Sequence, residues 1–306
     1  MWRTRALGAA LVATLSLPAA TYVIPDSLPG PARGPARPGG PEAGPASALG
    51  TYGGLATWVD MFDKGPWKNP GRTTRRMAER GTATLFLQTS NYRKNNDIYR
   101  PRAMSRLLEA AHANGMKVIA WYLPSYAHPR RDWRRTKAAV TFVSGNGQFF
   151  DGFAMDIEAT VEPKIAVRNR RAIALSDRLR RYVGDDYALG AITPDPVTQR
   201  FWPSFPYKKL RARYDVFLTM AYWTFRTRGE RRVHRYARDA LAIVRAKTND
   251  EKVPVHVIGG IASDASVAEV RGFARAAVKF DALGASLYDF PITSHGQWTQ
   301  MQRLND

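Results

Sequence analysis

The stretch Asp151-Gly-Phe-Ala-Met-Asp-Ile-Glu158 is typical of a short β-strand that ends in two carboxylates. Strand side chains alternate, so its Phe, Met and Ile fall on one face while Asp156 and Glu158 share the other. At ~3.3 Å per residue the two acids are roughly 6 to 7 Å apart along the chain. Partial burial would push their pKa values apart, which suits acid/base chemistry. The alternative is a strand that simply ends in solvated acids.

The chain from residue 55 onward repeats an alternation of apolar strand and amphipathic helix. Eight strands are expected, at 55–63, 83–88, 117–124, 151–158, 187–193, 215–223, 253–260 and 282–290. Repeated strand–helix alternation requires a parallel sheet, and eight units fit a closed (β/α)8 TIM barrel, an α/β fold. An open doubly wound sheet is the alternative, but no glycine-rich phosphate loop follows the first strand.

The N-terminal part of the chain differs in composition from the rest. Residues 1–25 combine a basic start with an uncharged run, which predicts a signal peptide or a membrane anchor. Residues 26–50 are rich in Pro, Gly and Ala and are expected to form a disordered tether. Residues 51–306 are then a single barrel domain. We therefore expect a secreted or cell-surface protein that contacts the membrane only if the first segment stays uncleaved.

Charge and cysteine content narrow the classes of function. The 306 residues contain no cysteine, which excludes disulfides, thiolate metal sites and a cysteine nucleophile. The net charge is +20, from 46 Lys and Arg against 26 Asp and Glu. Such basicity suggests anionic cell-wall polymers or lipid headgroups as surroundings, or only a solvated basic surface. No motif for specific nucleic-acid binding is found.

Acids and aromatics gather where the expected strands end, the edge at which barrel enzymes carry their chemistry. Aromatic faces suit sugar rings, and carboxylates bind hydroxyls and protonate glycosidic oxygens. For any one aromatic, core packing is the alternative. The candidate site residues are Trp58, Asp60, Gln88, Trp121, Tyr122, Asp156, Glu158, Tyr222, Trp223, Tyr288 and Asp289.

Other chemistries find little support in the sequence. The five histidines lack the spacing of metal ligands, and His256 lies in an apolar strand, where a core histidine is expected. No Gly-x-Ser-x-Gly nucleophile motif is found. The sequence therefore predicts neither a metal nor another cofactor. The loop 194–211, with its four aromatics, either lines a substrate cleft or is a packed connection.

The fourth expected strand resembles the signature of the family 18 glycoside hydrolases, the chitinase-like barrels, written Asp-Gly-x-Asp-x-Asp-x-Glu. Asp151, Gly152, Asp156 and Glu158 match it, while Ala154 replaces the middle acid. Further along, Met220-Ala-Tyr222 is similar to that family's Met-x-Tyr, although Trp223 stands where an Asp usually follows.

The resemblance implies a role for three residues. Glu158 would protonate the leaving oxygen, Asp156 would steady the substrate's N-acetyl group as it attacks the anomeric carbon, and Tyr222 would hydrogen-bond that group. A weaker resemblance is to the family 25 lysozyme-like barrels, in which Asp60 would supply a further acid.

Together these features predict a glycoside hydrolase acting on an N-acetylhexosamine polysaccharide, chitin-like or peptidoglycan. A non-catalytic carbohydrate-binding barrel is the alternative.

Overall fold

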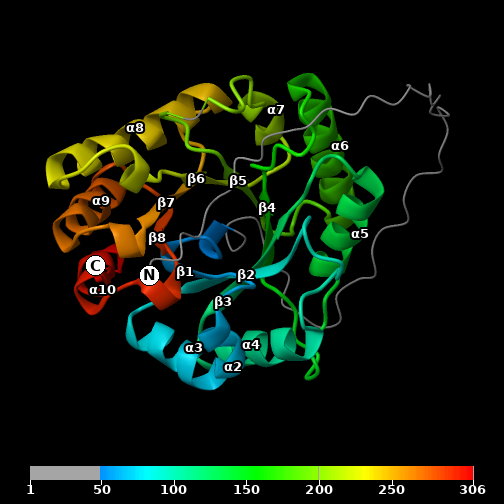
Figure 1. Cartoon of the computed structure of the whole chain (residues 1–306), viewed down its shortest axis with the longest axis horizontal. Coiled ribbons are helices and arrows are strands. Elements are labelled where there is room, and N and C mark those ends of the chain that lie inside the picture. The colour runs from blue at the N-terminus through cyan, green and yellow to red at the C-terminus, as the bar shows by residue number, and fades with distance from the viewer. Residues whose placement is uncertain (1–48, 199, 306) are drawn as a thin grey trace, which may run out of the picture. The chain divides into compact units, whose positions relative to one another are not determined.

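The computed structural model describes residues 49–198 and 200–305, which form a closed barrel of eight parallel strands (Figure 1). Each strand pairs with the next, and β1 closes the barrel against β8. The strands are β1 (Gly54–Val59), β2 (Thr84–Asn91), β3 (Lys117–Leu123), β4 (Gly152–Asp156), β5 (Leu189–Thr193), β6 (Val216–Met220), β7 (Val255–Ile261) and β8 (Gly284–Tyr288). The predicted (β/α)8 TIM barrel is confirmed. The expected signal segment and nearly all of the tether lie outside the described residues.

Helices surround this barrel on its outer side (Figure 1). They are α2 (Lys64–Lys68), α3 (Pro70–Glu79), α4 (Pro101–Ala113), α5 (Pro129–Val140), α6 (Ile165–Val183), α7 (Tyr207–Arg211), α8 (Glu230–Thr248), α9 (Val267–Lys279) and α10 (His295–Met301). Four short 3-10 turns accompany them: η1 (Trp223–Phe225), η2 (Ala262–Asp264), η3 (Phe290–Ile292) and η4 (Gln302–Leu304). Over residues 49–198 and 200–305, every helix is too short or too polar to cross a membrane.

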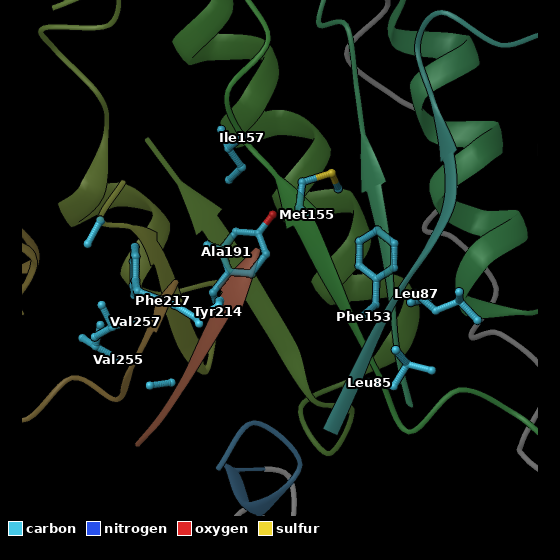
Figure 2. Close-up of a cluster of buried hydrophobic side chains, with 14 of the residues drawn as sticks. Leu85, Leu87, Phe153, Met155, Ile157, Ala191, Tyr214, Phe217, Val255 and Val257 are labelled. Atoms are coloured by element: carbon cyan, nitrogen blue, oxygen red, sulfur yellow. The ribbon is translucent and has the colours of Figure 1, made fainter. Parts of the chain in front are cut away.

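The outer core lies between the strands and the helices. Figure 2 shows Phe153, Met155 and Ile157 of the β4 segment in this layer, with Leu85 and Leu87 from β2. These β4 side chains are fully buried, as the alternation of the sequence predicts. Because this face belongs to the outer core, the acids on the opposite face point into the barrel.

The inner core fills the barrel itself. Trp58 stacks on Phe86 with ring centroids 4.1 Å apart, and both belong to a cluster with Ala154. At the N-terminal end of the strands, the buried Tyr52 donates a hydrogen bond to the carbonyl of Phe153 at 2.8 Å. A side chain at Gly190 would meet the Tyr52 ring at 2.8 Å, so only glycine fits there. Packing closes this end of the barrel, and barrel enzymes carry their chemistry at the opposite end.

A chain of hydrogen bonds crosses the inner core. His256 Nδ1 lies 2.9 Å from the carbonyl oxygen of Tyr52, so this nitrogen carries the proton. His256 Nε2 therefore accepts from the hydroxyl of Ser286 at 2.9 Å, and Ser286 in turn accepts from Trp58 Nε1 at 2.8 Å. Burial lowers the pKa of His256 to about 4. The expectation of a satisfied core histidine is confirmed.

Candidate active site

The candidate site lies at the carboxyl ends of the strands, above the inner core. In β1, Ala56 and Trp58 face inward, and Asp60 continues this face just beyond the strand. In β4, Ala154 faces inward and Asp156 follows on the same face. The strand ends at Asp156, two residues earlier than expected, and Glu158 lies in the turn that follows. The short loops after the strands thus carry several of the acids over the barrel opening.

Asp156 and Glu158 interact directly through their charges. Asp156 is buried, and its Oδ1 has no hydrogen-bond partner among the described residues. Burial, together with the neighbouring Glu158, raises the pKa of Asp156 well above its usual range. Burial also raises the pKa of the half-buried Glu158, and Arg93 offsets part of that increase. The pair therefore retains a proton at a pH where ordinary carboxyls have lost theirs, as proton donation requires.

Tyr222 lies beside this pair, in the segment that follows β6. Burial and the charges of Glu158 and Asp156 raise the pKa of its hydroxyl well above the usual range, and Asp289 adds to the effect. The hydroxyl stays protonated and can donate a hydrogen bond. The Tyr222 ring is 6.4 Å from that of Tyr288, which extends the site toward β8.

Three further acids occupy the opposite side of the opening. Asp60, Asp63 and Asp289 are buried, and each places a carboxylate oxygen within 4.8 Å of the others. Asp60 accepts hydrogen bonds from the Tyr288 hydroxyl at 2.8 Å and the Phe62 amide at 2.6 Å, while Asp63 accepts from the Asp60 amide at 2.8 Å. Such a group could hold a cation, but these donors already engage oxygens of Asp60 and Asp63. The expectation of no metal stays a prediction.

Gln88 and Trp121 complete the inward-facing part of the site. Gln88 accepts a hydrogen bond from the amide of Met61 at 3.1 Å and so supports the β1 loop. Trp121 lies edge-on to Trp58, with ring centroids 5.7 Å apart. Its Nε1 is buried without a partner in the described part of the chain. The site therefore has an unused donor on Trp121 as well as an unused oxygen on Asp156.

Two residues predicted to bind substrate face the other way. Tyr122 follows the inward-facing Trp121, so it points to the outer core and donates to Asp132 Oδ1 at 2.8 Å. Trp223 follows Tyr222 and is fully buried against Phe273, with ring centroids 4.9 Å apart. Neither has surface for a ligand, so both expectations are corrected. In β3, the alternation of side chains means that Trp121 and Tyr122 cannot both face inward.

Asp151, the first acid of the resembling motif, lies at the start of β4, far from the strand end that bears the site. It accepts a hydrogen bond from the amide of Val118 at 2.8 Å and pairs with His112 at 2.9 Å. Burial opposes its ionisation, but these partners and Lys117 outweigh it and lower the pKa of Asp151. This acid fastens β4 to β3 and α4.

Arg93 was not identified from the sequence. It lies in the loop after β2, where Arg135 holds the backbone by donating to the carbonyl of Asn91 at 2.7 Å and to the carbonyl of Lys94. Arg93 is exposed, and its charge acts on Glu158. Only the path of this loop brings the two residues together, and no local sequence pattern encodes it.

The loops after the strands also expose apolar side chains around the opening. Five of the large apolar side chains exposed in the described residues lie on these loops: Phe62, Val161, Phe201, Phe225 and Ile292. The loop 194–211 is mainly a packed connection, because Trp202, Phe205 and Tyr207 are buried. Only Phe201 of its four aromatics is exposed.

No family model matches the chain, and no curated protein sequence matches it. Solved structures share its fold. A family GH18 chitinase from Cycas revoluta, in complex with allosamidin, is 10% identical with a TM-score of 0.61, covering 83% of this chain and all (100%) of that chain. The spore cortex-lytic enzyme SleL of Bacillus cereus is 8% identical, with a TM-score of 0.61 and coverages of 82% and 74%. An endo-1,4-beta-mannanase from Rhizomucor miehei is 11% identical, with a TM-score of 0.59 and coverages of 78% and 86%. At these identities the likeness establishes the fold, a barrel common among glycoside hydrolases.

Proposed function

We propose that the chain is a glycoside hydrolase that cleaves a polysaccharide containing N-acetylhexosamine, at or outside the cell surface. The observation that carries the proposal is the Asp156–Glu158 pair, whose carboxyls retain a proton at the open end of the barrel beside Tyr222. The structural neighbours named as a chitinase, a mannanase and a cortex-lytic enzyme support the same class of reaction.

In this proposal Glu158 is the general acid. Its carboxyl gives a proton to the glycosidic oxygen as the bond from that oxygen to the anomeric carbon breaks. The carbonyl oxygen of the substrate's own acetamido group attacks that carbon, and Asp156 steadies the acetamido nitrogen. Water then attacks the anomeric carbon, the bond from that carbon to the acetamido oxygen breaks, and Glu158 takes up a proton from the water, which restores the acid. Tyr222 donates a hydrogen bond to the acetamido group and holds it in place.

The surroundings suit a sugar chain. The half-buried Tyr288 lies at this end of the barrel, and the exposed Phe62 and Phe225 extend the apolar surface outward. Sugar rings pack on such faces through their C–H groups. Exposed aromatics on separate loops favour a chain of several sugars over a single one.

A non-catalytic carbohydrate-binding barrel is the second candidate. One observation favours it: Ala154, directly below Asp156, supplies no acid where the resembling family has one. The Asp156 Oδ1 consequently lacks a carboxyl neighbour on its own strand that could share its proton.

Product analysis separates these candidates. The purified full chain would be incubated with N-acetylglucosamine oligosaccharides and with peptidoglycan, and the products examined by mass spectrometry. New reducing ends would support the hydrolase, and their masses would identify the cleaved bond. Retention of the protein on either polymer without any product would support the binding barrel.

A further inference from the structure

A strongly basic groove lies on the outside of the barrel, between α8 and α9, which are neighbours in Figure 1. Its volume is about 810 Å³. The residues that line it comprise five lysine or arginine side chains and one carboxylate: Arg231, Arg235, Arg275, Lys279, Arg303 and Glu230. Gly272 and Ala274 are small and also line it. The groove is remote from the acids at the barrel opening, so the candidate active site does not account for it.

The charge of this groove is not neutralised by the protein. Its one carboxylate, Glu230, already pairs with Arg271 and with Arg275, whose Nη1 lies 3.4 Å from Oε1. Arg231, Arg235 and Lys279 are exposed and form no ion pair within the described chain. Like charges held side by side without counter-charges raise the energy of the fold, and an anionic ligand would relieve that repulsion.

Further along α8 is a second, separate hollow of about 330 Å³, lined by Arg238 and Arg245 together with Glu251. Its arginines are already engaged, because Arg238 pairs with Asp239 and Arg245 donates to the carbonyls of Phe280 and Asp281. In the larger groove, Arg231 and Arg235 are one helical turn apart, so its own cations recur along the line of the helix. A ligand with anionic groups at regular intervals would match this spacing.

We propose that this α8–α9 groove binds a linear polyol-phosphate chain, a wall polymer whose phosphodiesters recur along a flexible backbone. Cations from both α8 and α9 line the groove and can contact one chain together, whereas a flat lipid surface would touch only the outermost of them. Single-stranded nucleic acid is held largely by stacking on aromatic rings. The residues that line the larger hollow include none of Phe, Tyr or Trp. The inference is independent of whether the barrel opening hydrolyses a glycan.

His234 gives an internal reporter of occupancy. It lines the groove between Arg231 and Arg235, and its pKa is lowered by burial and then by Lys279, Arg275 and Arg238, with Glu230 opposing them. Phosphate groups seated beside these cations would offset their effect. The pKa of His234 is therefore expected to rise when the groove is filled.

The test measures binding of the full chain to poly(glycerol phosphate) at moderate salt. The groove variant R231Q/R235Q/K279Q is compared with R72Q/R102Q/R106Q, which removes the same charge from exposed positions of α3 and α4. Removing three phosphate contacts should weaken binding by at least about tenfold, and the control should lose far less. NMR titration of His234 should show a raised pKa with the polymer present.

Two results would overturn the proposal. Equal losses of affinity in both variants would mean that the overall charge of the protein attracts the polymer and that the groove is not a specific site. Binding only to phosphatidylglycerol vesicles or to a single-stranded oligonucleotide, with none to poly(glycerol phosphate), would assign the groove to another partner. Circular dichroism of both variants would establish that each is folded, since all six positions are exposed.

Discussion

At the scale of single residues, the site depends on which side chains the barrel turns inward. Asp156 and Tyr222 face the opening, whereas their neighbours Ile157 and Trp223 belong to the outer core. The sequence predicts a set of acids and aromatics at the strand ends, and the structure turns some of them inward, whereas Tyr122 and Trp223 pack into the outer core. It does not decide between Trp121 and Tyr122, because both are large aromatics and only the register of the strand selects one of them.

The Arg93 side chain should set the upper pH limit of the proposed reaction. Its charge lowers the pKa of Glu158 against the larger effect of burial. Replacing Arg93 with Met removes that charge, so the pKa of Glu158 rises and the acid stays protonated to higher pH. The alkaline limb of the kcat/KM profile should therefore move to higher pH.

The exposed Arg102 of α4 provides the control, because R102M removes an equal charge that does not contribute to the pKa shift of Glu158. Its profile should match that of the unmodified chain. An unchanged limb in R93M, or one displaced to lower pH, would show that Glu158 is not the titrating acid.

At the scale of elements, the strands follow from the sequence far better than the loops do. All eight strands were expected, since apolar runs between amphipathic helices leave little choice. The short α2 was missed because its Lys-Gly-Pro-Trp-Lys sequence contains two poor helix formers. The path of the β2–α4 loop could not be predicted from the sequence, because it depends on Arg135, which lies some forty residues away in α5.

Arg135 should be essential to that loop. It is 1% exposed, and replacing it with Met would leave the buried carbonyls of Asn91 and Lys94 without their donor. The free energy of unfolding should fall by about 3 kcal/mol, as for other buried charged donors. Amide exchange over 92–99 should also become faster. Chemical denaturation and hydrogen exchange would measure the two effects.

Arg134 is a matched control on the same helix. It pairs with Asp97 at 2.7 Å, but its side chain is 59% exposed. The R134M change should therefore cost less than about 1 kcal/mol. If the two variants were equally destabilised, the buried donor would not be what fixes the loop.

At the scale of the whole molecule, the inner core links stability to pH. The folded protein holds His256 with a pKa of about 4, below its ordinary value of 6.5. Between these values the unfolded chain binds more protons, so stability falls as pH decreases from 6.5 to 4. The stabilisation is fully present above pH 6.5, and about 3 kcal/mol of it should be lost by pH 4.

Urea unfolding of the unmodified chain and of H256Q across pH 4 to 7 would measure this pH-dependent contribution of His256 to stability. H256Q should be less stable near neutral pH, because Ser286 and the Tyr52 carbonyl lose a partner. The difference in unfolding free energy between the two proteins should narrow toward pH 4. If their unfolding free energies instead ran parallel over the whole pH range, a neutral, buried His256 would be contradicted.

The central claim is that Glu158 protonates a glycosidic oxygen. The most direct test compares the release of new reducing ends by the unmodified chain, by E158Q and by E79Q. Glu79 is an exposed acid at the end of α3 and controls for the loss of one charge. Turnover of the oligosaccharide or peptidoglycan should fall about 10²- to 10⁴-fold in E158Q, with binding retained, and should be unchanged in E79Q. Undiminished turnover in E158Q would contradict the account.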